Sequence, residues 1–106
     1  MALETKIISV EGYKDKDGVR EYPYTMTKFP AKKGLEVQLK LMEDNLTSDF
    51  IQDVICSCVS LGSVKMTPAK FDDHFSGKYA HLMNVYNSVL EFNFDENFTE
   101  NGTVED

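Results

Sequence analysis

The residue types best suited to metal binding or nucleophilic catalysis are few and do not form a recognisable site. The two cysteines and two histidines are Cys56, Cys58, His74 and His81. If both cysteines lie on one helix, their side chains point about 200° apart, so they could not both bind one zinc ion. A Cys–His catalytic pair would be expected to show a local signature, and none is present. The sequence therefore predicts no metal site and no cofactor.

The acidic residues give no catalytic pair either. Asp72 and Asp73 are adjacent, as are Asp95 and Glu96. Neighbouring carboxylates of this kind need not converge on one substrate atom, as acid–base catalysis requires. The sequence also lacks a phosphate-binding loop and a dinucleotide-binding fingerprint. We therefore expect no catalytic residues and no enzymatic activity.

Composition favours a small acidic domain that binds protein. The chain has 106 residues, with 18 acidic and 11 basic side chains and a net charge of −7. Nucleic-acid binders need a basic face, and a membrane span needs about 20 apolar residues, so neither partner is expected. The start, Met1–Lys6, lacks the basic and apolar regions of a signal peptide, so we expect a cytoplasmic protein.

The first 29 residues have the pattern of a β-hairpin. β-Branched residues are frequent in Lys6–Tyr13, and Lys14–Gly18 is a turn cluster that ends in Asp-Gly. Aromatic and threonine residues then favour a second strand over Val19–Phe29. Pro23 cannot donate a ladder hydrogen bond, so it indicates an edge strand or a break.

Helical patterns follow. Leu35, Leu39 and Met42 have helical spacing after Pro30, and an apolar face runs from Phe50 to Leu61 before Gly62. Good N-cap residues precede this second helix at Thr47 and Ser48, and Thr67-Pro68 is typical of another helix start.

The longest helix is expected from Tyr79, with an apolar stripe that reaches Phe94. The last residues are acidic, and a disordered tail is predicted from Thr99. The predicted fold is thus α+β but mostly helical, with an N-terminal β-hairpin, a three- to four-helix bundle and a disordered acidic C-terminal tail. Residues 1–98 form the single domain, with the hairpin in 1–29 and the helices in 30–98, and 99–106 form a flexible tail.

Two stretches resemble the small phage tail assembly chaperones. Residues 24–42, YTMTKFPAKKGLEVQLKLM, are similar to the segment with the pattern F-x-A-x-K-G-L that forms their first helix. Residues 71–78, FDDHFSGK, running on to VLEFNF at 89–94, resemble their closing segment, in which a Phe-x-Gly turn precedes a long helix. Between them, Asp44-Asn45-Leu46 stands where that family often has a Leu-Gly-Pro-like element.

The resemblance implies a function and partners. Such chaperones bind the helical tape measure protein in the host cell cytoplasm and keep it soluble while the tail assembles. In some phages a frameshifted longer product recruits the tail tube protein. The alternatives are a structural tail or baseplate subunit of the virion, or a small acidic inhibitor of a host protein. The oligomeric state is left open.

A holdase for amphipathic helices needs an exposed apolar groove with adaptable side chains. We expect this groove to lie between the first helix and the last one. The predicted partner-binding residues are Phe29, Leu35, Leu39 and Met42 against Tyr79, Met83 and Tyr86.

Overall fold

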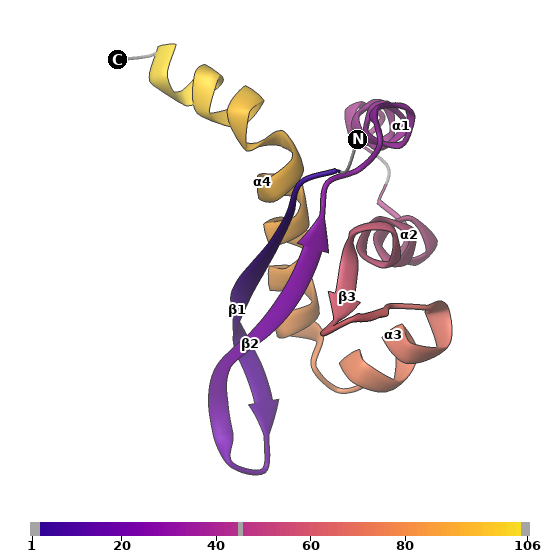
Figure 1. Cartoon of the computed structure of the whole chain (residues 1–106), viewed down its shortest axis with the longest axis vertical. Coiled ribbons are helices and arrows are strands. Elements are labelled where there is room, and N and C mark those ends of the chain that lie inside the picture. Colours follow the sequence, from indigo (N-terminus) through magenta and orange to yellow (C-terminus); the bar gives the residue numbers. More distant parts are fainter. Residues whose placement is uncertain (1–2, 45, 105–106) are drawn as a thin grey trace.

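A four-stranded antiparallel sheet and four helices make up the fold in the computed structural model, which describes residues 3–44 and 46–104, with side chains as far as Phe94 (Figure 1). The sheet order is β1-β2-β3-β4. The strands are β1 (Thr5–Asp15), β2 (Gly18–Thr27), β3 (Val59–Leu61) and β4 (Val64–Lys65). The helices are α1 (Ala31–Met42), α2 (Ser48–Cys58), α3 (Pro68–Phe75) and α4 (Tyr79–Val104).

The predicted N-terminal hairpin is present and bent. Its strands pair with Ile8 opposite Tyr24 and Val10 opposite Tyr22, and the register shifts at a bulge between Val10 and Tyr13. Gly12 lies in this bulge with a φ of 89°, and a Cβ there would come within 2.9 Å of Asn84 Nδ2 on α4. The bulge therefore favours a glycine, because an L-residue at this positive φ would be strained and the Asn84 side chain would have to move.

The prediction of a mostly helical chain with one hairpin and a bundle is wrong. The helix expected to continue to Leu61 ends at Cys58, and Val59 adopts an extended conformation with φ −100° and ψ 140°. A second hairpin follows, with Gly62 at φ 62° in its turn, and β3 pairs with Thr25 and Met26 of β2. The edge of β2 that is not paired with β1 thus forms hydrogen bonds with this short segment, and the helices pack around a sheet.

Pro23 shows why β2 is paired on both sides over only a short length. It lies opposite Ser9 of β1, whereas β3 reaches only Thr25 and Met26. The strand on the other side of β2 therefore ends before Pro23, where the missing N–H would interrupt a ladder.

The predicted helix starts at Thr47 and Thr67 are confirmed. Thr47 Oγ1 accepts a hydrogen bond from Phe50 N at 3.1 Å, and Thr67 Oγ1 accepts one from Lys70 N at 3.3 Å. Such caps satisfy backbone donors that have no partner within the helix. In contrast, α1 begins after Pro30 without a side-chain cap.

The C-terminal helix is longer than predicted. α4 continues to Val104, so the prediction of a disordered tail from Thr99 is wrong for this part of the backbone. No glycine or proline interrupts the sequence from Tyr79 to Asn101, which lets one helix continue. Residues 105–106 lie outside the described residues, and a flexible tail separate from a 1–98 domain stays a prediction.

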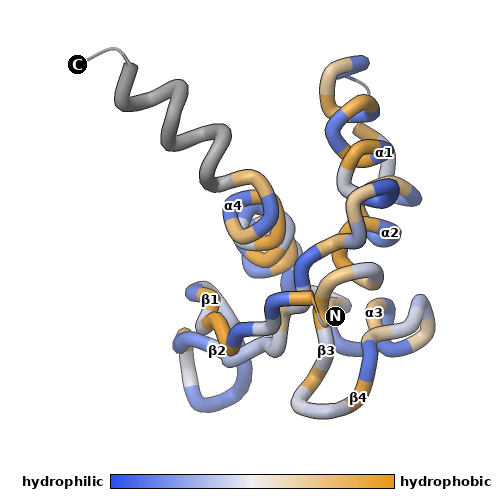
Figure 2. The backbone as a smooth tube through the Cα atoms, turned by 45° about the horizontal axis from the view of Figure 1, so that its top comes forward, coloured by the Kyte–Doolittle hydropathy of each residue, from blue (hydrophilic) through white to orange (hydrophobic). Residues whose placement is uncertain are grey.

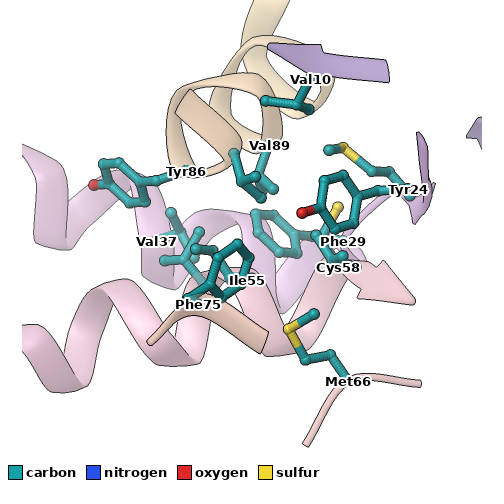
Figure 3. Close-up of a cluster of buried hydrophobic side chains, with 14 of the residues drawn as sticks. Val10, Tyr24, Phe29, Val37, Ile55, Cys58, Met66, Phe75, Tyr86 and Val89 are labelled. Carbon is teal, nitrogen blue, oxygen red and sulfur yellow. The ribbon is translucent and has the colours of Figure 1, made fainter. Parts of the chain in front are cut away.

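The core lies between the sheet and the helices. Side chains from β1, β2, α1, α2, α3 and α4 meet in one buried cluster (Figure 3). Its fully buried members include Tyr24, Met26, Ile55, Met66 and Phe75. These large side chains come from β2, α2, α3 and the connection between β4 and α3, so the cluster holds the hairpin and the helices together.

Candidate functional site

Helix α1 presents an apolar stripe to solvent. Leu35, Leu39 and Met42 are 56%, 52% and 74% exposed, and their spacing puts them on one side of the helix. The opposite side carries Val37, which is only 1% exposed. Figure 2 shows apolar and polar residues mixed along this peripheral helix. A surface helix normally has one apolar face, so the second, exposed apolar face of α1 makes this helix the candidate site for a partner.

Asn93 of α4 fixes the chain where β2 leads into α1. Its Oδ1 accepts a hydrogen bond from Phe29 N at 2.8 Å, and its Nδ2 donates to Val89 O at 2.9 Å. The Phe29 and Phe94 rings lie beside this junction, 6.3 Å apart. Lys33 of α1 also forms an ion pair with Asp53 of α2. These contacts hold α1 against the domain while its apolar stripe stays exposed.

Replacing Asn93 with alanine should loosen α1 more than the rest of the chain. The Phe29 amide would lose its acceptor, and an unsatisfied buried donor costs about 1–3 kcal/mol. We expect faster amide hydrogen exchange from Phe29 through α1, with α2 and the sheet changed much less. The matched control is Asn87→Ala, an exposed position of the same helix. Uniformly faster exchange would contradict a local role for Asn93.

The structure divides the predicted partner-binding residues between two regions. Leu35 lines a hollow of about 330 Å³ where α1 meets Asn93 and Phe94. Tyr79 lines a different hollow of about 280 Å³ beside α3. Tyr79 and Phe94 are 15 positions apart on α4, which corresponds to about 22 Å along the helix. The first helix and the start of the last one therefore do not form the single groove that was expected.

Burial separates the predicted set further. Phe29 is 8% exposed and Tyr86 is 3% exposed, so both belong to the core. The Tyr86 hydroxyl has no hydrogen-bond partner among the described residues, and burial raises its pKa. Tyr79 and Met83 are exposed at 69% and 37%. Binding of a partner stays a prediction for all of them, and the α1 stripe contributes three exposed apolar residues on one side of one helix.

A buried network of tyrosine and histidine joins four elements. The Tyr24 hydroxyl of β2 lies 2.6 Å from His81 Nε2 and 2.8 Å from His74 Nε2. His81 Nδ1 lies 2.7 Å from the Glu11 carbonyl oxygen, which can only accept, so Nδ1 carries the proton. In neutral His81, Nε2 then accepts from the Tyr24 hydroxyl, and His74 donates its Nε2–H to the Tyr24 oxygen. The Tyr24 hydroxyl, both ring nitrogens of His81 and Nε2 of His74 thus have partners.

The surroundings of the network favour its neutral form. Burial, with the nearby His81 and Lys78, lowers the pKa of His74 to about 4. Burial also lowers the pKa of His81 and raises that of Tyr24. Tyr24 is 1% exposed and His81 is 0% exposed, so both lie in the interior of the domain, whereas His74 is half-buried. The network therefore connects β1, β2, α3 and α4 as a structural junction.

The two cysteines lie on α2 and are poor nucleophiles. Burial raises the pKa of the Cys58 thiol to about 11, and Asn93 Nδ2 lies 3.6 Å from its sulfur. Burial also raises the pKa of the half-buried Cys56. A protonated thiol is a weak nucleophile and metal ligand. Within the described residues, no group of three or more His, Cys, Asp or Glu side chains is placed to hold a metal ion.

Over the part of the chain that the structure describes, none of the helices combines the length and apolar character needed to cross a bilayer.

Comparison with known proteins places the chain. The family model described as "Phage tail assembly chaperone protein, TAC" matches residues 39–104. The match starts within α1, continues through α4 and includes the whole of the second resembling stretch, residues 71–94. Searches of the curated proteins and of the solved structures gave no significant match. Because the family model covers more than half of the sequence, the chain belongs to the phage tail assembly chaperone family.

Proposed function

We propose that this protein binds helical segments of the tape measure protein through the exposed stripe of α1 and keeps them soluble during tail assembly. The observation that carries the proposal is the exposure of Leu35, Leu39 and Met42 on a helix of a tail assembly chaperone. An amphipathic helix needs a partner surface with this kind of apolar spacing. In this role the protein acts by binding in the host cytoplasm, without catalysis.

The neighbouring side chains suit such a client. Met42 is unbranched and adapts to differently shaped apolar surfaces. The hollow next to Leu35 gives a side chain of the client helix a place to insert beside Phe94. The net charge of −7 keeps the chaperone soluble while an apolar stripe is exposed. A longer frameshifted product that recruits the tail tube protein would use the same domain as its client-binding part.

The test is direct binding to tape measure fragments. Leu39→Lys should weaken binding at least about tenfold, because burial of a leucine contributes about 1.5–3 kcal/mol and a lysine cannot replace it. The measurement is titration calorimetry with overlapping helical fragments of the tape measure protein. The matched control is Val19→Lys, which changes a side chain that is 69% exposed on the distant hairpin.

Two outcomes would contradict the proposal. Equal affinity of the Leu39→Lys and wild-type chains would exclude the α1 stripe as the client site. Tape measure protein that stays equally soluble in cells with and without this chain would exclude the holdase role. Mass spectrometry of purified virions adds a separate check, because a structural subunit would be retained there.

A further inference from the structure

The two flanks of the α1 stripe differ in charge. At about 100° per residue, Leu35, Leu39 and Met42 fall within a sector of roughly 60°. One flank lines the hollow beside Phe94 and has the uncharged Ala31 and Gln38. The other flank alternates in charge along the helix and consists of Lys32, Glu36, Lys40 and Glu43. All four of these charged side chains are exposed.

When two copies of α1 run antiparallel, their charged flanks bring lysines opposite glutamates. In an antiparallel pair each flank faces the same flank of the other helix, so Lys, Glu, Lys, Glu meets Glu, Lys, Glu, Lys. We propose that α1 pairs antiparallel with α1 of a second copy of this chain, about a two-fold axis near Gln38. Lys40 then lies opposite Glu36 of the second copy, and Lys32 lies opposite Glu43 of the second copy.

The apolar stripe gives the same register. With the axis near Gln38, Leu35 of one copy lies opposite Met42 of the other, and the two Leu39 side chains lie beside each other. Charge pairs and apolar pairs therefore centre within about 1.5 residues of one another, which is about 2 Å along the helix. A parallel pair would place the charged flank against the uncharged one and would leave the charges without partners. This agreement identifies a second copy as the occupant, in an isologous interface.

The charged flank is available for this pairing. Lys32, Glu36, Lys40 and Glu43 form no ion pair with any other residue in the described ranges 3–44 and 46–104, while Lys33, on the side nearer α2, is paired with Asp53. α1 also lies at the periphery of the fold, at the opposite end from the turn that joins β1 to β2 (Figure 1). A second copy could approach this side of the helix without displacing another element.

The size of the stripe sets the strength of the pair. α1 has 12 residues and is about 18 Å long, so its exposed stripe amounts to a few hundred Å². A stable interface buries about 800 Å² on each partner. The dimer should therefore be weak and concentration-dependent. Displacement of the second copy from the α1 stripe by a tape measure helix would rest on the proposed function. The dimer itself does not rest on it.

The test is charge reversal, followed by analytical ultracentrifugation of the full chain over a wide concentration range. The wild type should associate to a dimer as concentration rises. Glu36→Lys and Lys40→Glu should each weaken association at least about tenfold, because each places like charges opposite each other twice. An equimolar mixture of the two variants should associate again, since the lysine introduced at position 36 then faces the glutamate introduced at position 40.

The mixture also separates pairing from helix stability. Glu36 and Lys40 are four residues apart, so each variant also places like charges near each other within its own helix. Mixing does not remove that repulsion, and recovery would therefore report contact between chains. A wild type that stays monomeric, or a mixture that stays monomeric, would overturn the proposal. A chain that dimerises in this way but does not bind tape measure fragments would support the pairing and contradict the proposed function.

Discussion

Replacing Tyr24 with phenylalanine should lower the free energy of unfolding by about 2–4 kcal/mol, although only one oxygen is removed. That oxygen accepts from His74 and its proton is donated to His81 Nε2, over 2.8 and 2.6 Å. Without it, His81 keeps an unpaired acceptor in a fully buried site and His74 loses its acceptor. Each unsatisfied buried group costs about 1–3 kcal/mol.

Urea denaturation followed by circular dichroism measures this change. The matched control is Tyr22→Phe, because Tyr22 lies two residues away in the same aromatic cluster and is only half-buried. We expect the control to change stability by less than about 0.5 kcal/mol, as for a partly solvated hydroxyl. Equal effects of the two substitutions would show that the Tyr24 hydroxyl contributes no more to stability than the Tyr22 hydroxyl does.

The sequence predicted those parts of the fold that local signals determine. The Asp-Gly turn, the threonine caps and Pro68 each act within a few residues of themselves. The β3–β4 hairpin was missed because Val59 and Leu61 continue the apolar pattern of α2, and a strand of three residues is too short to show a period of two. Pairing with Thr25 and Met26, far away in sequence, decides its conformation.

The candidate site was predicted only in part, because local spacing shows which residues share a helix face but not which distant elements they contact. Helical spacing identified Leu35, Leu39 and Met42 as one stripe. The spacing could not show that Val37, on the other side, is the residue that packs into the core. Nor could it show that α4 meets α1 at Asn93, far from Tyr79. The Tyr24–His74–His81 network was also missed, because its members come from three elements and no local motif connects them.

Acid should destabilise the protein between about pH 6.5 and pH 4, before most carboxylates are protonated. The pKa of His74 falls from 6.5 to about 4 on folding, because burial and nearby positive charge disfavour its charged form. Between these values the unfolded chain binds a proton that the folded chain does not. The contribution of neutral His74 to stability is therefore complete above its unfolded-state pKa of 6.5 and decreases as the pH falls below it. The upper limit on the loss of unfolding free energy from His74 is about 3 kcal/mol. The expected loss is smaller, because the ring is only partly buried and solvent screens its charge.

Thermal melts from pH 8 to pH 4 would measure this loss, with His74→Phe as the comparison. The phenylalanine keeps an aromatic ring beside Tyr13 and Tyr22, and the Tyr24 hydroxyl can still donate to His81. The variant should lose less stability than the wild type over the same range, with the remainder due to His81, whose pKa is also lowered. Asp15 contributes only at lower pH, since its pKa is lowered from 3.8. Parallel pH profiles for variant and wild type would show that the acid sensitivity does not arise from His74.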